Sequence, residues 1–173
     1  MNTPLKIMIC AGEVSGDMHA AALMRALRAV AGRPILFRGF GGDAMRAEGA
    51  ELLYHTDRIA IIGITPVLLN LPFLLGMMRR MKREILAWQP DLVLTVDYPG
   101  MNLRLARFAH DHGFKTVHYI CPQVWAWHRS RIPKLARMLD LLLCILPFEP
   151  ALFRQTPLAA RFTGHPLVDR AAE

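Results

Sequence analysis

The chain has 173 residues, a hydrophobic content of 53% and a formal net charge of +7 at pH 7. This length suits one domain with a sizeable core, because a chain of roughly 150 residues buries about 70% of its unfolded surface. The three cysteines, Cys10, Cys121 and Cys144, are far apart and odd in number, which argues against a disulfide framework and against metal-ligand spacing. The basic excess indicates an anionic partner: a nucleic acid, a phosphorylated ligand or a membrane surface.

Short apolar runs alternate with segments of helical periodicity along the chain. Strands are predicted at 7–9, 35–37, 51–54, 92–96, 116–120, 141–146 and near 162, with helices between most of them. Alternation of this kind predicts an α/β fold, namely a doubly wound, mostly parallel and Rossmann-like sheet with right-handed crossovers.

The first predicted strand leads into Cys10-Ala-Gly-Glu-Val-Ser-Gly-Asp17, a loop with two glycines, two acids and a serine. A loop at the carboxyl end of a parallel strand, opening a helix, is where α/β proteins bind ligands. It matches neither a P-loop nor a dinucleotide fingerprint, and its acids would repel phosphate, so a sugar or hydroxyl ligand suits it better. The alternative is an ordinary tight turn in which Ser15 or Asp17 caps the helix.

Two later strands also end in loops that carry functional side chains. The fourth leads into Asp97-Tyr-Pro-Gly-Met-Asn102, where the carboxylate of Asp97 either acts as a general base or serves the turn. The fifth leads into a segment with Trp125, Arg129 and Arg131. Aromatic rings pack on sugars and arginines clamp phosphates, although nucleic-acid binding or a core position for the tryptophans would use the same residues.

Residues 59–78 carry no charge, and a basic cluster follows directly. About 20 apolar residues span a bilayer as a helix, but prolines, glycines and an asparagine interrupt this run. An apolar segment followed by basic residues predicts insertion into the interface of an anionic membrane. A core helix with a solvated basic end is the alternative. The predicted membrane contacts are Leu68, Leu69, Leu71, Phe73, Leu74, Met77, Met78, Arg79 and Arg80.

Six short motifs occur in the order seen in bacterial lipid-A-disaccharide synthases, a family that the chain resembles over essentially its whole length. The motifs are Ala11-Gly-Glu-Val-Ser-Gly-Asp17, Gly41-Gly-Asp-Ala-Met-Arg-Ala-Glu-Gly49, Val96-Asp-Tyr-Pro-Gly-Met-Asn102, Val124-Trp-Ala-Trp127, Leu146-Pro-Phe-Glu149 and Gly164-His-Pro166. Together they are highly specific, although no single one is. The chain departs from the family pattern at Gly100, where a second acid is common, and at Gln123, where a small hydroxyl residue is common.

The resemblance implies the N-terminal domain of a B-type glycosyltransferase fold and a role in lipid A and lipopolysaccharide biosynthesis. It implies an inverting transfer of 2,3-diacylglucosamine from its UDP carrier to 2,3-diacylglucosamine 1-phosphate, giving a β(1→6) disaccharide and UDP without a cofactor or a metal. By motif, Asp97 is implied as the general base for the acceptor 6-hydroxyl, and Glu13 as an acid that positions the acceptor or supports the base. The implied or chosen substrate contacts are Ser15, Gly16, Asp17, Asn102, Trp125, Arg129 and Arg131.

In this family a second, UDP-sugar-binding domain begins where this sequence ends. Residues 1–173 are therefore expected to form a single acceptor- and membrane-binding domain that is inactive alone, with the UDP-sugar donor bound by the missing domain. The resemblance also implies a peripheral position on the cytoplasmic face of the inner membrane. The expected partners are an acylated glucosamine phosphate and an anionic membrane, not nucleic acid. The alternative is a non-catalytic lipid- or membrane-binding module that retains the fold.

Overall fold

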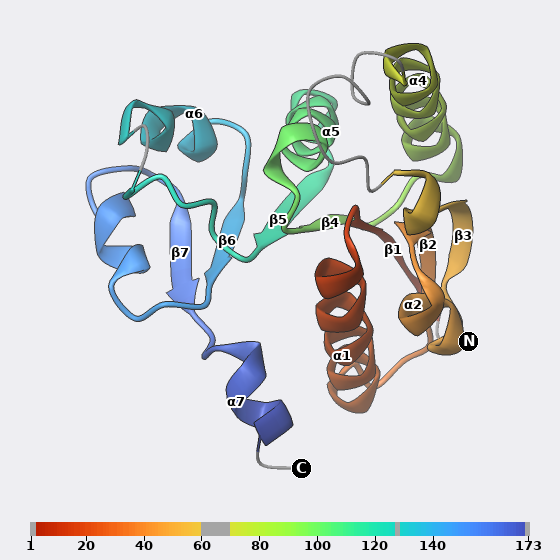
Figure 1. Ribbon diagram of the computed structural model, residues 1–173, viewed down its shortest axis with the longest axis horizontal. Helices are drawn as coiled ribbons and strands as arrows, with labels where there is room; N and C mark the ends of the chain where they lie inside the picture. The colour runs from red at the N-terminus through yellow and green to blue at the C-terminus, as the bar shows by residue number, and fades with distance from the viewer. Residues whose placement is uncertain (1–2, 60–69, 127–128, 172–173) are drawn as a thin grey trace.

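The computed structural model describes residues 3–59, 70–126 and 129–171, and the strands within them form one seven-stranded parallel sheet (Figure 1). The strand order is β3-β2-β1-β4-β5-β6-β7. The strands are β1 (Leu5–Ala11), β2 (Ile35–Gly41), β3 (Glu51–His55), β4 (Leu92–Val96), β5 (Lys115–Tyr119), β6 (Leu141–Cys144) and β7 (Ala159–Phe162). The predicted α/β class and doubly wound parallel sheet are confirmed.

Helices cover both faces of this sheet (Figure 1). On one face, α1 (Val14–Val30) and α2 (Asp43–Ala47) pack on β1 and β2. The opposite face carries α4 (Leu71–Trp88), α5 (Pro99–Asp111) and α6 (Ile132–Ala136). The remaining described elements are η1 (Thr56–Arg58), η2 (Arg129–Arg131), η3 (Glu149–Phe153) and α7 (Pro166–Ala171). The strand order reverses between β1 and β4, and α/β sheets bind ligands beyond the carboxyl ends of strands at such a point.

The central strands are buried on both faces, which explains their continuous apolar sequence. In β1, Ile7 and Ile9 pack against α1, whereas Met8 and Cys10 pack against α4 and α5. Burial of each large apolar side chain contributes roughly 1.5–3 kcal/mol. The central strands are therefore packed on both faces, and the loops that follow them differ in their side chains.

The structure describes only part of the uncharged run at 59–78. Residues 60–69, which include the predicted membrane contacts Leu68 and Leu69, lie outside the described residues. From Leu71 the chain forms α4, whose buried stripe is Met77, Met81 and Ile85. Met77 is only 1% exposed and packs in the core beneath the helix, so the structure corrects the prediction that it contacts a membrane.

The opposite side of α4 remains outside the core. Leu71 and Leu75 are exposed, and Arg79 and Arg83 continue the same four-residue spacing along the helix. Residues four apart share one helix face, so this face is apolar at its start and basic further on. No helix among the described residues is long and apolar enough to cross a membrane.

The other predicted contacts on α4 lie at the edge of that face. Phe73, Leu74 and Met78 are half-buried, and the Phe73 ring meets the Tyr54 ring edge-on with centres 5.9 Å apart. Arg80 is exposed, and its guanidinium carbon lies 5.3 Å from the centre of the same Tyr54 ring. Their contact with a membrane stays a prediction.

Candidate functional site

A cavity of about 450 Å³ lies at the carboxyl ends of β4, β5 and β6. Segments far apart in the sequence meet there, including parts of three of the motifs. The lining includes Asp97, Ile120, Gln123, Leu146, Glu149 and His165. We take this cavity as the candidate active site because it combines the ligand edge of the sheet with a carboxylate in its wall.

Asp97 reaches the cavity from a backbone conformation that few residues adopt. Asp97 and the following Tyr98 both have φ near 47°, in the left-handed region. The Asp97 backbone N–H donates to the Tyr119 carbonyl at 2.9 Å, and the Asp97 carbonyl accepts from the Asn102 side chain at 2.8 Å. These two bonds fix the backbone of the loop at Asp97, a residue that is half-buried.

Asn102 supports this loop from beneath. Its side chain is fully buried, and its amide nitrogen also lies 3.1 Å from the Cys10 carbonyl and 3.0 Å from the Val96 carbonyl. The amide therefore ties the end of β1 to the end of β4. The structure gives Asn102 a positioning role, which corrects the expectation of a substrate contact on the rim.

Ile120 marks a second strained point in the cavity wall. It has φ 73°, which is unusual for a β-branched residue, and its backbone N–H donates to the Leu143 carbonyl at 3.0 Å. Strained backbone of this kind costs about 1–3 kcal/mol and tends to gather at functional sites. It supports the choice of this cavity independently of Asp97.

Asp17 has a different role from the substrate contact that the sequence predicts. The Asp17 side chain is buried, and its carboxylate accepts from the backbone N–H groups of Gly42, Ala44 and Met45 at 2.7, 2.9 and 3.0 Å. It therefore caps α2 and not α1, whose N-cap is Glu13 without a side-chain hydrogen bond. A structural role replaces the expected substrate contact.

The rest of the first loop packs on the loop after β4. A side chain at Gly12 would overlap the Tyr98 ring, so the glycine permits this close approach. Burial, and then the charge of Glu13, raise the pKa of Tyr98. Glu13 and Ser15 are exposed and Gly16 is buried in α1, so their contact with a substrate stays a prediction.

Trp125 connects indirectly to the cavity. Its side chain is 37% exposed, meets the Phe148 ring edge-on at 5.5 Å, and hydrogen-bonds to Glu149. Burial raises the pKa of Glu149, whose carboxylate also accepts from the Leu146 backbone at 3.1 Å. Arg131 is exposed on η2, and the side chain of Arg129 lies outside the described residues. Phosphate binding by the arginines stays a prediction.

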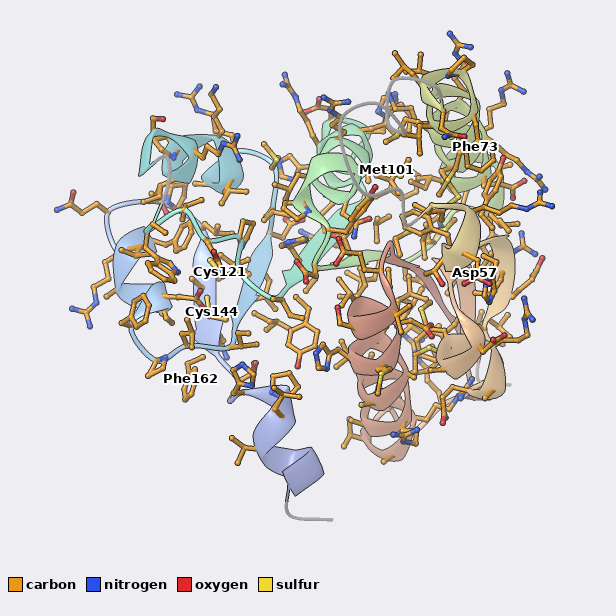
Figure 2. The ribbon with its side chains drawn as sticks, in the orientation of Figure 1. Asp57, Phe73, Met101, Cys121, Cys144 and Phe162 are labelled. Atoms are coloured by element: carbon orange, nitrogen blue, oxygen red, sulfur yellow. The ribbon has the colours of Figure 1, made fainter. Side chains whose placement is uncertain are left out.

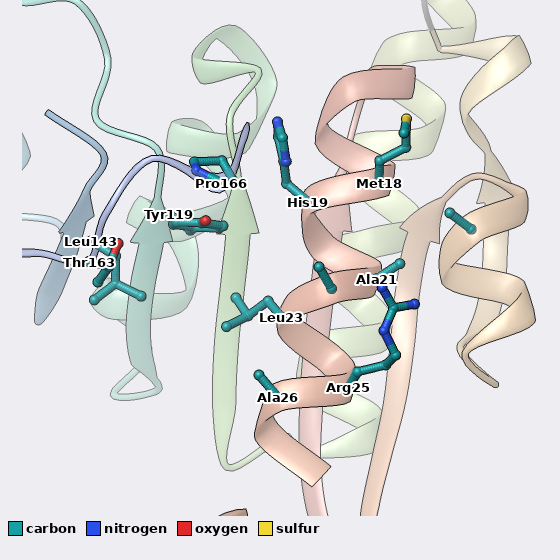
Figure 3. A pocket seen from close by; sticks show the side chains of 12 residues that line it. Met18, His19, Ala21, Leu23, Arg25, Ala26, Tyr119, Leu143, Thr163 and Pro166 are labelled. Atoms are coloured by element: carbon teal, nitrogen blue, oxygen red, sulfur yellow. The ribbon is translucent and has the colours of Figure 1, made fainter. Parts of the chain in front are cut away.

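A second cavity of about 430 Å³ runs along α1 (Figure 3). Small and apolar residues of α1 face Tyr119, Leu143 and Pro166 across it. His19 lines both cavities, so they are neighbours. This second cavity lies beside the helix that the first loop opens, and it holds no carboxylate among its described lining residues.

A family model described as lipid-A-disaccharide synthetase matches residues 7–173. The chain belongs to this family. The family makes the disaccharide of lipid A and consists of glycosyltransferases, as the motifs predicted. The lipid-A-disaccharide synthase of Chromohalobacter salexigens is 42% identical over 165 residues, which are 95% of this chain and 42% of that protein.

The homologue from Myxococcus xanthus is 40% identical over 171 residues, covering 98% of this chain and 44% of its own length. The chain thus spans about two fifths of the length of the curated relatives that it matches. A UDP-N-acetylglucosamine 2-epimerase superposes with a TM-score of 0.68 at 13% identity, over 96% of this chain and 50% of that one. The glycotransferase of kitacinnamycin superposes at 0.61 with 16% identity, over 95% and 52%. These likenesses confirm the fold expected for one half of a B-type glycosyltransferase.

Proposed function

We propose that residues 1–173 form the acceptor- and membrane-binding domain of an inverting hexosyltransferase. The reaction transfers 2,3-diacylglucosamine from UDP-2,3-diacylglucosamine to 2,3-diacylglucosamine 1-phosphate and releases UDP. The chain matches about two fifths of the length of relatives that carry this family name, and we assign donor binding to the part of those relatives beyond the match. The isolated chain is therefore expected to bind acceptor without turning it over.

In this reaction Asp97 takes the proton from the acceptor 6-hydroxyl. The hydroxyl oxygen attacks C1 of the donor sugar, and the bond from C1 to the UDP phosphate oxygen breaks, which inverts C1 and gives the β(1→6) linkage. General-base catalysis contributes about 100- to 10,000-fold. The observation that carries the proposal is the Asp97 carboxylate in the wall of the cavity, on a loop fixed by Asn102.

The acyl chains and phosphate of the acceptor suit the rest of the surface. Leu71 and Leu75 are exposed at the start of α4, with Arg79 and Arg80 beyond them. Exposed leucines next to arginines favour an anionic membrane interface, where each basic residue contributes about 1 kcal/mol. We place the chain at the cytoplasmic face of the inner membrane, with phospholipid and not nucleic acid as the partner of its basic charge.

Calorimetric titration of the purified chain tests this proposal. 2,3-Diacylglucosamine 1-phosphate in detergent micelles should release or absorb heat of binding above a detergent blank, whereas UDP should give none. Tight binding of UDP would place the donor site on this half and overturn the assignment. If neither ligand binds while anionic liposomes still do, the chain is a membrane-binding module without the acceptor site.

A further inference from the structure

We propose that Cys121, Cys144 and Glu149 form a binding site for a thiophilic divalent cation of the zinc class. One coordination position of this site faces the cavity that contains Asp97. The three residues are all buried, and their ligand atoms lie within 4.8 Å of one another. Figure 2 shows the two cysteines beside one another.

Three separate elements bring these side chains together. Cys121 follows β5, Cys144 ends β6, and Glu149 begins η3. The left-handed turn at Ile120 and its bond to Leu143 keep the chain beside the end of β6 as it enters Cys121. The bond from the Leu146 backbone to Glu149 Oε2 returns the glutamate over the same strand end. The cluster therefore rests on fixed backbone and not on flexible surface side chains.

The donor set and the spacing fit zinc chemistry. Thiolates and a carboxylate are ordinary zinc ligands, and bonds of about 2.3 Å to sulfur place two sulfurs about 3.8 Å apart in a tetrahedral site. A zinc–oxygen bond of about 2.0 Å would place the carboxylate oxygen about 3.5 Å from each sulfur, so the ligand atoms need to approach by no more than about 1.3 Å from their present spacing. Three protein ligands with an open fourth position is the pattern of zinc sites that take an exchangeable ligand.

The open fourth coordination position faces the cavity that contains Asp97. Cys121 and Glu149 line the cavity, whereas Cys144 lies behind them in the core with Leu142 and Phe153. A fourth ligand would therefore arrive from the cavity, as water or as an anionic oxygen of a bound molecule. A bound divalent ion would hold Cys121 and Cys144 as thiolates.

Cobalt is the probe, because Co²⁺ bound by thiolates absorbs light in a way that unbound Co²⁺ does not. The full chain is stripped with a chelator, reduced with a phosphine and titrated with Co²⁺. We expect thiolate-to-cobalt charge-transfer absorption that saturates at one equivalent and disappears when Zn²⁺ is added. Cys121→Ser and Cys144→Ser should abolish this absorption, and Glu149→Gln should weaken binding roughly tenfold or more.

Cys10→Ser is the matched control, because Cys10 is also buried but lies on β1 among Met8 and Phe40, outside the cluster. It should leave the titration unchanged. Absence of the absorption from the reduced wild-type chain, or its survival in both cluster variants, would overturn the site. Zinc-edge X-ray absorption of the loaded wild-type chain needs no variant and should show two sulfur neighbours at about 2.3 Å. A first shell of nitrogen and oxygen alone would also overturn it.

Discussion

The loops after β1 and β4 leave neighbouring strands at the same edge of the sheet and each open a helix, yet the acids near them do different things. Asp17, in the first turn of the helix α1 that the first loop opens, is buried and caps α2. Asp97 in the second is half-buried in the wall of a cavity and has a left-handed backbone. The three backbone donors on Asp17 show that an acid beyond a strand can serve the fold alone.

The two loops also depend on each other. The Tyr98 ring of the second lies against Gly12 of the first, and Asn102 joins the ends of both strands. We propose that the first loop acts mainly as a support and that the second carries the chemistry.

The largest expected effect is on the rate of transfer. A chimera joins residues 1–173 to the part of the Chromohalobacter salexigens relative beyond the match, to which we assign donor binding. In this chimera, Asp97→Asn should lower kcat about 100- to 10,000-fold. Acceptor binding should change little, because the amide keeps the size of the carboxylate. Asp43→Asn, at an exposed acid on α2, is the control and should retain the rate. Full transfer by the Asp97 variant would remove the base from the mechanism.

Stability should respond most to the first loop. Asp17→Ala leaves three backbone N–H groups without their acceptor and should lower the free energy of unfolding by about 3 kcal/mol. Asp43→Ala, whose partners Arg46 and His55 are at the surface, should lower it by less than about 1 kcal/mol. Urea unfolding measures both. An Asp17 variant that keeps its stability and loses acceptor binding would make the first loop part of the site.

A pH effect should come from beneath the second loop. His118 is fully buried on β5 with Nδ1 2.8 Å from Thr95 Oγ1, and burial lowers the pKa of His118 to about 4. The unfolded chain binds this proton more readily, so the stability present above pH 6.5 is lost as the pH falls toward 4. Between about pH 7 and pH 5 the wild type should lose about 2 kcal/mol more than His118→Gln. Parallel profiles in urea would mean that folding does not change the pKa of His118 and would contradict this prediction.

The smallest effect concerns the membrane surface. Leu75→Ser should weaken binding to anionic liposomes about tenfold, because a leucine side chain no longer enters the interface. Leu86→Ser lies on the same helix with nearly equal exposure, 43% against 45%, and should bind as the wild type does. Sedimentation with liposomes compares them. Equal loss in both variants would show that the start of α4 has no special part in binding.

Much of the fold can be predicted from the sequence because burial on both faces leaves a plain pattern. The run at 92–96 predicts β4 with its observed bounds. The predicted strand 141–146 is too long, because β6 ends at Cys144 and the chain then turns toward Glu149. That turn depends on a buried carboxylate, which hydrophobic periodicity does not report.

The site is harder to predict, because its partners are distant in the sequence. The sequence around Asp17 does not indicate that the backbone N–H groups of Gly42 and Met45 donate to its carboxylate. Likewise, Cys121 comes near Cys144 only because β5 pairs with β6. The motif that ends in Glu149 and the motif that contains His165 have no role that the sequence predicts, although both line the cavity with Asp97. The order of the motifs is the available signal, because a parallel sheet collects the ends of its strands at one edge.

A crystal structure of the chain with 2,3-diacylglucosamine 1-phosphate tests the central claim most directly. We expect the sugar in the cavity beyond β4, with its 6-hydroxyl within hydrogen-bond reach of the Asp97 carboxylate and its acyl chains directed toward α4. A sugar bound instead in the cavity along α1, away from Asp97, would contradict the account.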